Sequence, residues 1–462
     1  PFKFQGSIGR QLCRQILSTK LPFGPHDYQL DVITRVLDGE DVIAVSATGS
    51  GKSAYIYMVM IIALAILDDR SLCPSACFPA DPAMVVICPT TALEEDLEQK
   101  MTSYGLRAKA VNAVTKMDAE CANINIWQLV ETEVTVLLIS PEMLATQGFQ
   151  GLLQHKRFKV QIFKLVVDEI HLLNSWGVNF RPTFQQIGLL RQRFPTSTSF
   201  IGLTGTLQKG KPYQSICKFL GLQPGKFYLH RRSNARPDIQ LNIHTIRCNQ
   251  ATENFPELNW VLENSGKTLI FCLTIRLGFK LAVYFWYQDS QYLLANDRLR
   301  LFNSLNSSEY NDQTLRLLRG HSNVETASTV ITIATDKLSV GVDISDFQRV
   351  LIIDPTDLDD LWQKGGRVGR NRLKVKDAQV FVYIPSAKMK LAQDLAAERR
   401  MSDDSGTMDV GLVDLISSSC LVSGINEAYN NPVNDPKCSN LCTSCQALPP
   451  LVRPEICNCN YC

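Results

Sequence analysis

The stretch DVIAVSATGSGKS, residues 41–53, runs directly into an apolar segment from Ala54 to Leu67. Its first five residues predict a buried β-strand, and the apolar segment predicts a core helix. Between the two lies a glycine-rich loop that ends in Lys52 and Ser53. This order of strand, loop and helix favours a phosphate-binding loop of the Walker A type over a glycine-rich turn that happens to precede Lys-Ser.

We expect this loop to bind the phosphates of ATP, because its glycines allow backbone amides to turn towards phosphate oxygens at a helix N-terminus. Lys52 would neutralise the β- and γ-phosphates, and Ser53 would ligate Mg²⁺. The nucleotide-binding residues predicted in the loop are Thr48, Gly49, Ser50, Gly51, Lys52 and Ser53.

Length and composition indicate an ordinary globular protein of two or three domains, with 462 residues of which 45% are hydrophobic and 20% charged. The formal net charge is only +2, so a polyanion would have to be held by a local basic groove. The apolar segment 54–67 is shorter than the roughly 20 residues that cross a bilayer, and no secretory signal is visible at the start. We therefore expect an intracellular protein with no membrane partner.

Short apolar runs alternate with helical patterns along most of the chain, which predicts an α/β protein with parallel sheets covered by helices on both faces. The polar, basic stretch HRRSNARP, residues 230–237, separates two series of such runs. We expect domains at residues 1–232, 233–395 and 396–462, the last one helical and rich in cysteine. The strands predicted for the first series are Val42–Val45, Met84–Cys88, Val134–Ile139, Leu165–Val167 and Phe200–Leu203, and those for the second are Thr268–Cys272, Val330–Ala334, Val350–Ile353 and Val380–Tyr383.

A second chemical motif is LVVDEIH, residues 165–171, in which a strand ends in adjacent carboxylates. Asp168 is placed to hold Mg²⁺, and Glu169 to orient or deprotonate the attacking water. Such a pair on its own would be better explained as a solvated strand end. The phosphate-binding loop upstream, at a distance that fits one α/β domain, favours the catalytic interpretation.

The acidic motif is followed by LLNSWGVNFRP, residues 172–182, which resembles the aromatic-rich loop of RecQ helicases. In that family the loop senses single-stranded DNA and couples it to ATP hydrolysis. Trp176 and Phe180 offer faces for base stacking and Arg181 a phosphate contact, whereas a structural interpretation would place both aromatics in the core. The resemblance covers roughly residues 23–445 and implies two tandem RecA-like domains with a helical zinc-binding subdomain after them.

The same resemblance assigns further residues in order along the chain. CPTT at 88–91 and LTGT at 203–206 are similar to motifs that grip the tracked strand or link hydrolysis to domain movement. IATDKLSVGVD at 333–343 and QKGGRVGR at 363–370 resemble helicase motifs five and six. The implied ATP contacts are Gln29, Gly341, Asp343 and Gln363, the implied DNA contacts are Thr90, Thr206 and Thr335, and the implied γ-phosphate arginines are Arg367 and Arg370.

These matches imply an ATP-dependent 3′–5′ DNA helicase or translocase that binds single-stranded and partly duplex DNA, in the nucleus, in recombination or repair. The chain is a divergent relative: Val178 and Asn179 replace the family's His and Asp, and the segment Asp336–Leu338 departs from motif five. A nucleic-acid-binding ATPase switch without unwinding activity is therefore an alternative. An RNA helicase is a weaker one, because the aromatic loop and the cysteine-rich tail favour DNA.

Seven of the fifteen cysteines lie between Cys420 and Cys462. Cys438, Cys442 and Cys445 have the spacing of a metal knuckle, and RecQ proteins carry a similar arrangement of one Cys, a helix and three close Cys. We expect a structural Zn²⁺ bound by Cys420, Cys438, Cys442 and Cys445. Cys457, Cys459 and Cys462 could supply an alternative ligand or a second, incomplete site, and disulfides are the competing interpretation.

Overall fold

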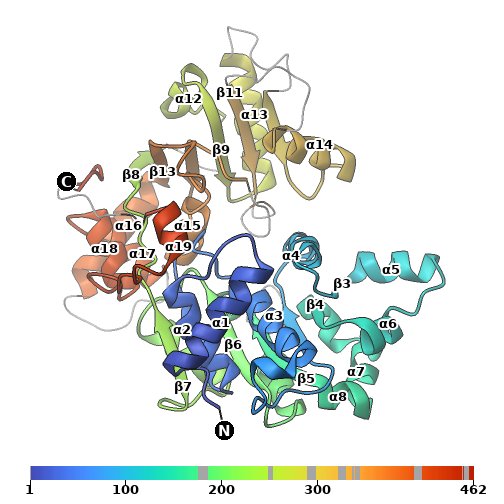
Figure 1. The fold of residues 1–462 in the computed structure, drawn as a ribbon. Helices are drawn as coiled ribbons and strands as arrows, with labels where there is room; N and C mark the ends of the chain where they lie inside the picture. The colour runs from blue at the N-terminus through green and yellow to red at the C-terminus, as the bar shows by residue number, and fades with distance from the viewer. Residues whose placement is uncertain are drawn as a thin grey trace. The chain divides into compact units, whose positions relative to one another are not determined.

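A computed structural model describes residues 2–174, 186–247, 253–288, 298–320, 329–335, 338, 344–399, 408–449, 451 and 457–462. The chain divides into two compact units (Figure 1). The first unit comprises Pro1–Asn234 and Pro432–Pro450, and the second comprises Ala235–Asn431 and Leu451–Cys462. The segment 396–462, expected to form a subdomain of its own, is thus shared between the two units.

The first unit is built on a seven-stranded sheet with the order β3-β4-β2-β5-β6-β1-β7. All strand pairs in it are parallel. The strands are β1 (Asp41–Val45), β2 (Ala83–Ile87), β3 (Ala108–Val111), β4 (Val136–Ile139), β5 (Ile162–Val167), β6 (Ser199–Thr204) and β7 (Phe227–Arg231).

Alternate residues of the strands supply two separate hydrophobic cores, because successive side chains of a strand point to opposite faces. Val42 and Ala44 pack with α1 (Ser7–Lys20), α2 (Asp27–Leu37) and α3 (Ala54–Asp68). Ile43 and Val45 belong to the core on the other face. The remaining helices of this unit are η1 (Arg70–Leu72), α4 (Thr91–Ser103), α5 (Ala113–Cys121), α6 (Ile126–Glu133), η2 (Pro141–Ala145), α7 (Gln147–Gln154), α8 (Lys156–Gln161), α10 (Gln186–Leu190), η4 (Arg191–Arg193), α11 (Lys211–Phe219) and α19 (Thr443–Ala447).

The second unit contains a six-stranded parallel sheet with the order β10-β11-β9-β12-β13-β8. Its strands are β8 (Ile239–Ile246), β9 (Gly266–Cys272), β10 (Leu299–Phe302), β11 (Thr329–Ala334), β12 (Arg349–Ile353) and β13 (Ala378–Pro385). Its helices are η5 (Pro256–Leu258), α12 (Trp260–Glu263), α13 (Ile275–Gln288), α14 (Ser308–Leu318), α15 (Leu358–Gly365), α16 (Ser386–Arg399), α17 (Val410–Ile416) and α18 (Leu421–Ala428).

The architecture confirms the predicted α/β class with two parallel RecA-like sheets, and each of the predicted strands overlaps a strand of the structure. Four strands were not predicted, namely β3, β7, β8 and β10, and these are the edge strands of the two sheets. Among the described residues, no helix combines the length and the apolar character needed to cross a membrane.

Candidate functional site

Three motifs meet at one edge of the first sheet, because β5, β6 and β1 are neighbours and run in the same direction. The phosphate-binding loop follows β1, the acidic motif follows β5, and the LTGT motif ends β6 between them. Backbone hydrogen bonds join the three strand ends: Ser46 N donates to Thr204 O at 3.2 Å, and Ile170 N donates to Leu203 O at 3.0 Å. The carboxyl edge of a parallel sheet is where α/β proteins bind ligands.

Two glycines of the phosphate-binding loop have left-handed backbone conformations, and its lysine folds back over the loop. Gly49 and Gly51 have φ values of 80° and 82°, a region that is costly for other residues. Lys52 Nζ donates to the carbonyls of Ser46 and Ala47 at 3.1 and 3.2 Å, so the ammonium group is drawn back over the loop. The predicted nucleotide contacts from Thr48 to Ser53 therefore form one compact cradle that leads into α3.

Gly205 allows the LTGT motif to approach this cradle closely. A Cβ atom at position 205 would lie 3.3 Å from Lys52 Nζ and 3.3 Å from Thr48 Cγ2. A larger side chain would press on the lysine that is predicted to contact the β- and γ-phosphates.

Asp168 is buried at the end of β5, and its carboxylate accepts a hydrogen bond from Glu169 N at 2.9 Å. Burial raises the pKa of Asp168 to about 7, the carboxylate of Glu169 adds to the rise, and Lys52 opposes it. A cation beside Asp168 would stabilise its charged form, so the environment fits a Mg²⁺ ligand.

A polar chain leads from the acidic motif into the LTGT motif. Glu169 has a φ of 49°, a left-handed conformation that is strained for a residue with a side chain, and its Oε2 lies 3.4 Å from His171 Nδ1. The same ring nitrogen lies 2.9 Å from Thr204 Oγ1, which donates to Thr206 O at 2.7 Å. A change at Glu169 can thus be transmitted through two side chains to the loop after β6.

Gln29, predicted to contact adenine, bridges α2 and the phosphate-binding loop. Its Oε1 accepts from His26 N at 2.9 Å, which caps α2, and its Nε2 donates to Gly51 O at 3.3 Å. Tyr28 adds a second connection, since its hydroxyl donates to Ser50 O at 3.0 Å. The start of α2 therefore fixes one side of the loop.

His26 brings this corner into contact with the cysteine-rich tail. Its Nδ1 lies 3.2 Å from Cys445 Sγ and 3.4 Å from Cys442 Sγ. With Cys438 these residues form a group whose ligand atoms all lie within 4.8 Å of one another. Burial and the positive charge of Arg232 lower the pKa of His26, which favours the neutral imidazole that metals bind.

The structure corrects the fourth member of the predicted zinc site, because His26 and not Cys420 accompanies Cys438, Cys442 and Cys445. The reason is the path of the chain: residues 432–450 belong to the first unit, whereas Cys420 is the N-cap of α18 in the second unit. Cys420 forms a group with Cys457, Cys459 and Cys462 instead.

The segment 432–450 is held on the first unit by polar contacts besides the cysteines. Ser444 Oγ donates to Gly24 O at 2.6 Å, and Ser439 N donates to the carboxylate of Asp27. Asp435 pairs with Arg232 at 3.1 Å. The Arg232 guanidinium also lies 4.2 Å from the centre of the Tyr28 ring, which in turn stacks on His26 at 4.8 Å.

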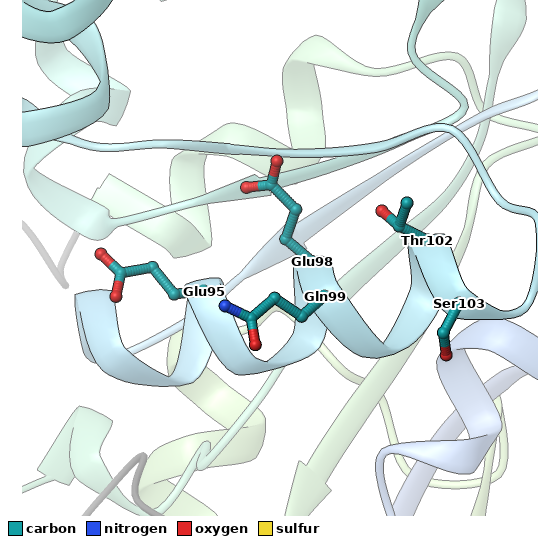
Figure 2. A pocket seen from close by; sticks show the side chains of 5 residues that line it. All are labelled: Glu95, Glu98, Gln99, Thr102 and Ser103. Atoms are coloured by element: carbon teal, nitrogen blue, oxygen red, sulfur yellow. The ribbon is translucent and has the colours of Figure 1, made fainter. Parts of the chain in front are cut away.

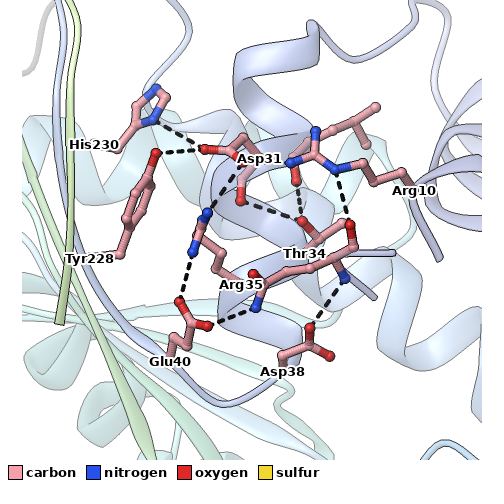
Figure 3. A network of polar contacts seen from close by, with 10 residues as sticks. Arg10, Asp31, Thr34, Arg35, Asp38, Glu40, Tyr228 and His230 are labelled. Carbon is pink, nitrogen blue, oxygen red and sulfur yellow. Dashed lines mark hydrogen bonds and ion pairs between the residues drawn. The ribbon is translucent and has the colours of Figure 1, made fainter. Parts of the chain in front are cut away.

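A polar network at the middle of α2 ties this helix to α1 and β7 (Figure 3). Asp31 accepts from the Tyr228 hydroxyl at 2.8 Å and pairs with Arg10, Arg35 and His230. Burial opposes its charge, but the hydrogen bonds from His230 and Tyr228 and the charge of Arg35 hold the pKa of Asp31 well below its usual range. The network fixes the helix that carries Gln29.

In the second unit, Gln363 and Arg367 are buried, while Arg370 is half-buried. The loop between the two arginines is held by Arg236, a residue that sequence reasoning did not single out for a role. Arg236 Nη2 donates to the carbonyls of Val368 and Gly369, both at 3.1 Å.

Arg236 is itself oriented by a carboxylate. Its Nε and Nη2 donate to Asp238 at 2.8 and 2.7 Å, in the forked geometry that guanidinium and carboxylate groups favour. Gly369 has a φ of 56°, and a Cβ there would lie 2.7 Å from Ala378 Cβ. The arginine-bearing loop is thus fixed both by Arg236 and by close packing.

The remaining predicted residues are placed as follows. Thr90 is half-buried and caps α4, accepting from Leu93 N at 3.4 Å. Thr206 is fully buried, and its backbone bonds to Thr204 Oγ1, whereas Thr335 is half-buried at the end of β11. Five predicted residues lie outside the described part of the chain: Trp176, Phe180, Arg181, Gly341 and Asp343.

A shallow pocket runs along the polar face of α4 (Figure 2). It is lined by Glu95, Glu98, Gln99, Thr102 and Ser103. Its carboxylates would repel phosphate, and Glu98 is already engaged with Lys109 Nζ at 3.1 Å and with the backbone of β3. We therefore do not assign the nucleotide to this pocket.

Comparison with known proteins agrees with this arrangement of motifs. Residues 26–214 match the family model of the DEAD/DEAH box helicases, and residues 252–372 match the helicase conserved C-terminal domain. The chain is 25% identical to the ATP-dependent DNA helicase RecQ of Haemophilus influenzae over 378 residues, which are 78% of this chain and 51% of that protein.

Two further proteins are similar to most of this chain, one in sequence and one in fold. The ATP-dependent DNA helicase Q1 of Pongo abelii is 25% identical over 75% of this chain and 49% of its own length, so the chain spans about half the length of these relatives. The solved structure of Mycobacterium smegmatis helicase Lhr bound to ssDNA and AMP-PNP superimposes with a TM-score of 0.60 at 16% identity, over 90% of this chain and 55% of that one. At this identity the superposition shows a shared fold.

Proposed function

Taking the chain as a helicase that contains a DEAD/DEAH box domain and a helicase C-terminal domain, we propose that it couples ATP hydrolysis to movement along single-stranded DNA in the 3′–5′ direction. The observation that carries the proposal is the convergence of the phosphate-binding loop, the acidic motif and the LTGT motif at one edge of the first sheet. The distant similarity to proteins named as RecQ DNA helicases favours DNA as the track. A nuclear role in recombination or repair stays a prediction from the sequence resemblance.

In this proposal Lys52 and the loop amides bind the β- and γ-phosphates, and Glu169 orients the attacking water. Ser53 and Asp168 would hold Mg²⁺, which supplies positive charge to the developing transition state. Arg367 and Arg370 add two further positive charges to the γ-phosphate, in the manner of arginine fingers. Each of these groups acts mainly on charge that develops during phosphoryl transfer.

The polar chain from Glu169 through His171 to Thr204 supports coupling between hydrolysis and movement. Loss of the γ-phosphate would release Glu169, whose strained backbone is held only by its surroundings. The shift would reach the loop after β6 through the contact between Glu169 and His171 and the hydrogen bonds of Thr204.

We also propose that His26, Cys438, Cys442 and Cys445 bind a structural Zn²⁺. In a tetrahedral site with zinc–sulfur bonds of about 2.3 Å and zinc–nitrogen bonds of about 2.0 Å, nitrogen and sulfur ligands lie about 3.5 Å apart. The separations of 3.2 and 3.4 Å are close to that value. The ion would fix residues 432–450 beside the start of α2, which contacts the phosphate-binding loop.

The test is a measurement of ATP turnover with single-stranded DNA, with single-stranded RNA and without nucleic acid, set beside strand displacement on a duplex with a 3′ overhang. We expect stimulation by DNA and displacement only with ATP. Trp176→Ala should remove most of the stimulation while changing basal turnover little, because a lost stacking partner costs about 1–3 kcal/mol of DNA binding.

The outcomes separate the alternatives. Stimulation by RNA alone would replace DNA with RNA as the track. DNA-stimulated turnover without displacement on 3′- or 5′-overhang duplexes would favour the switch without unwinding, for which the departures at Val178 and Asp336–Leu338 are the specific observation. Lys52→Ala serves as the control that removes turnover in every condition.

A further inference from the structure

The second unit contains a cluster of four cysteines that lies apart from the nucleotide-binding residues. Cys420, Cys457, Cys459 and Cys462 place their sulfur atoms within 4.8 Å of one another. Cys420 and Cys457 are half-buried, Cys459 is buried and Cys462 is exposed. The cluster joins residues that are far apart in the sequence, so its formation depends on the fold.

The sulfur separations are those of metal ligands. Cys420 Sγ lies 3.6 Å from Cys457 Sγ, and Cys459 Sγ lies 3.5 Å from Cys462 Sγ. Four thiolates around zinc, with bonds of about 2.3 Å, lie about 3.8 Å apart at the corners of a tetrahedron. A disulfide would require about 2.05 Å, and no cysteine among the described residues forms one.

The backbone around the cluster supplies the donors that thiolate sites use. The sulfur of Cys459 accepts hydrogen bonds from the backbone amides of Leu421 and Tyr461. Such bonds stabilise negative charge on sulfur and orient the ligand. Cys420 is the N-cap of α18 and Leu421 its first residue, so the cluster is anchored at the start of a helix.

We propose that Cys420, Cys457, Cys459 and Cys462 form a second structural zinc site, separate from the group that contains His26. Four thiolates in a closed tetrahedral arrangement are the donor set of structural zinc, and they leave no position open for a substrate. The site does not depend on the helicase activity proposed above.

The position of residues 457–462 indicates what the ion would do. Asn460, between two of the ligands, accepts from Ile243 N at 3.0 Å and donates from Nδ2 to Ile243 O at 2.8 Å. Ile243 belongs to β8, the edge strand of the second sheet. A zinc-bound loop would therefore hold Asn460 against the free edge of β8 and satisfy backbone groups that could otherwise pair with another chain.

The test is elemental analysis of the full chain, purified without chelators. We expect two zinc ions per chain, and one in Cys457→Ser and in Cys459→Ser. Cys121→Ser is the matched control, because Cys121 is exposed and belongs to neither group, and it should retain two. Deuterium uptake by the peptide that covers β8 should rise in the two site variants and not in the control.

A readout on the unaltered chain covers the case in which a variant does not fold. Alkylation under denaturing, non-reducing conditions after zinc removal should modify Cys420, Cys457, Cys459 and Cys462. A zinc content that Cys457→Ser and Cys459→Ser leave unchanged, iron with inorganic sulfide, or an unmodified cysteine among these four would each overturn the proposal.

Discussion

Arg236 offers a direct test of whether the arginine-bearing loop needs external support. The substitution Arg236→Ala removes four hydrogen bonds, two to Asp238 and two to the carbonyls of Val368 and Gly369. It leaves Asp238 without its ion-pair partner in a largely buried position, where the side chain of Asp238 is 15% exposed.

The expected loss of folding stability and of catalytic rate follows from these contacts. Removing one partner of a buried ion pair lowers the free energy of unfolding by about 3–5 kcal/mol. Because Asp238 is partly exposed, we expect a loss near the lower end of that range, about 3 kcal/mol. Displacement of a catalytic group by about 1 Å costs on the order of 100-fold in rate. We therefore expect kcat for ATP to fall by roughly 10- to 100-fold, with KM within about twofold, because Arg236 is not one of the predicted nucleotide contacts.

The assays are urea denaturation and steady-state ATP hydrolysis at saturating DNA. Arg236→Lys keeps the positive charge but cannot form the forked pair, so it should recover part of the stability and little of the rate. Arg316→Ala, on the exposed face of α14, is the control and should change stability by less than about 0.5 kcal/mol. An Arg236→Ala protein that is destabilised but hydrolyses ATP at the original kcat would refute the positioning role.

Four further predictions test the sites separately. Lys52→Ala should abolish ATP turnover and leave the urea midpoint unchanged, since the residue lies in a loop outside the core; turnover at the original rate would contradict the assignment. Arg370→Ala should retain nucleotide affinity, measured by fluorescent ATP binding, and lose hydrolysis; equal losses of both would exclude a finger role. His26→Ala should lower zinc content by one ion and raise KM for ATP, because its ring stacks on Tyr28, whose hydroxyl donates to Ser50 of the phosphate-binding loop; unchanged zinc content would remove His26 from the ligands. The pKa of Asp31 is lower in the folded state, so the stability that its charge contributes is present above about pH 4 and is lost as the pH falls below that value. The urea midpoints of Asp31→Asn and of the unaltered chain should therefore converge in acid. A difference that stays constant with pH would contradict this.

The strands that could be predicted from the sequence are the central ones. β2 and β4 are continuous apolar runs because both of their faces are covered. β7 and β10 are edge strands with mixed burial, and each includes an arginine. A search for apolar runs in the sequence misses such strands, because they become strands by pairing with a neighbour that is distant in the sequence.

The same distinction holds for the sites. The phosphate-binding loop and the acidic motif are each continuous in sequence, so they could be predicted residue by residue. His26 and Arg236 act through partners far along the chain, and His26 and Cys442 are 416 positions apart. One signal was available: seven cysteines are one ligand short of two tetrahedral sites, and histidine is the other common zinc ligand.

The return of residues 432–450 to the first unit has a consequence for dissecting this protein. The backbone passes between the two units three times, after Asn234, after Asn431 and after Pro450. A single proteolytic nick after Asn234 gives two polypeptides, residues 1–234 and 235–462, and both contribute to the first unit because residues 432–450 belong to it. Such a nick would therefore not separate the two units cleanly. A gene fragment that stops at residue 234 would encode a seven-stranded sheet whose proposed zinc site keeps His26 and has lost all three of its thiolates.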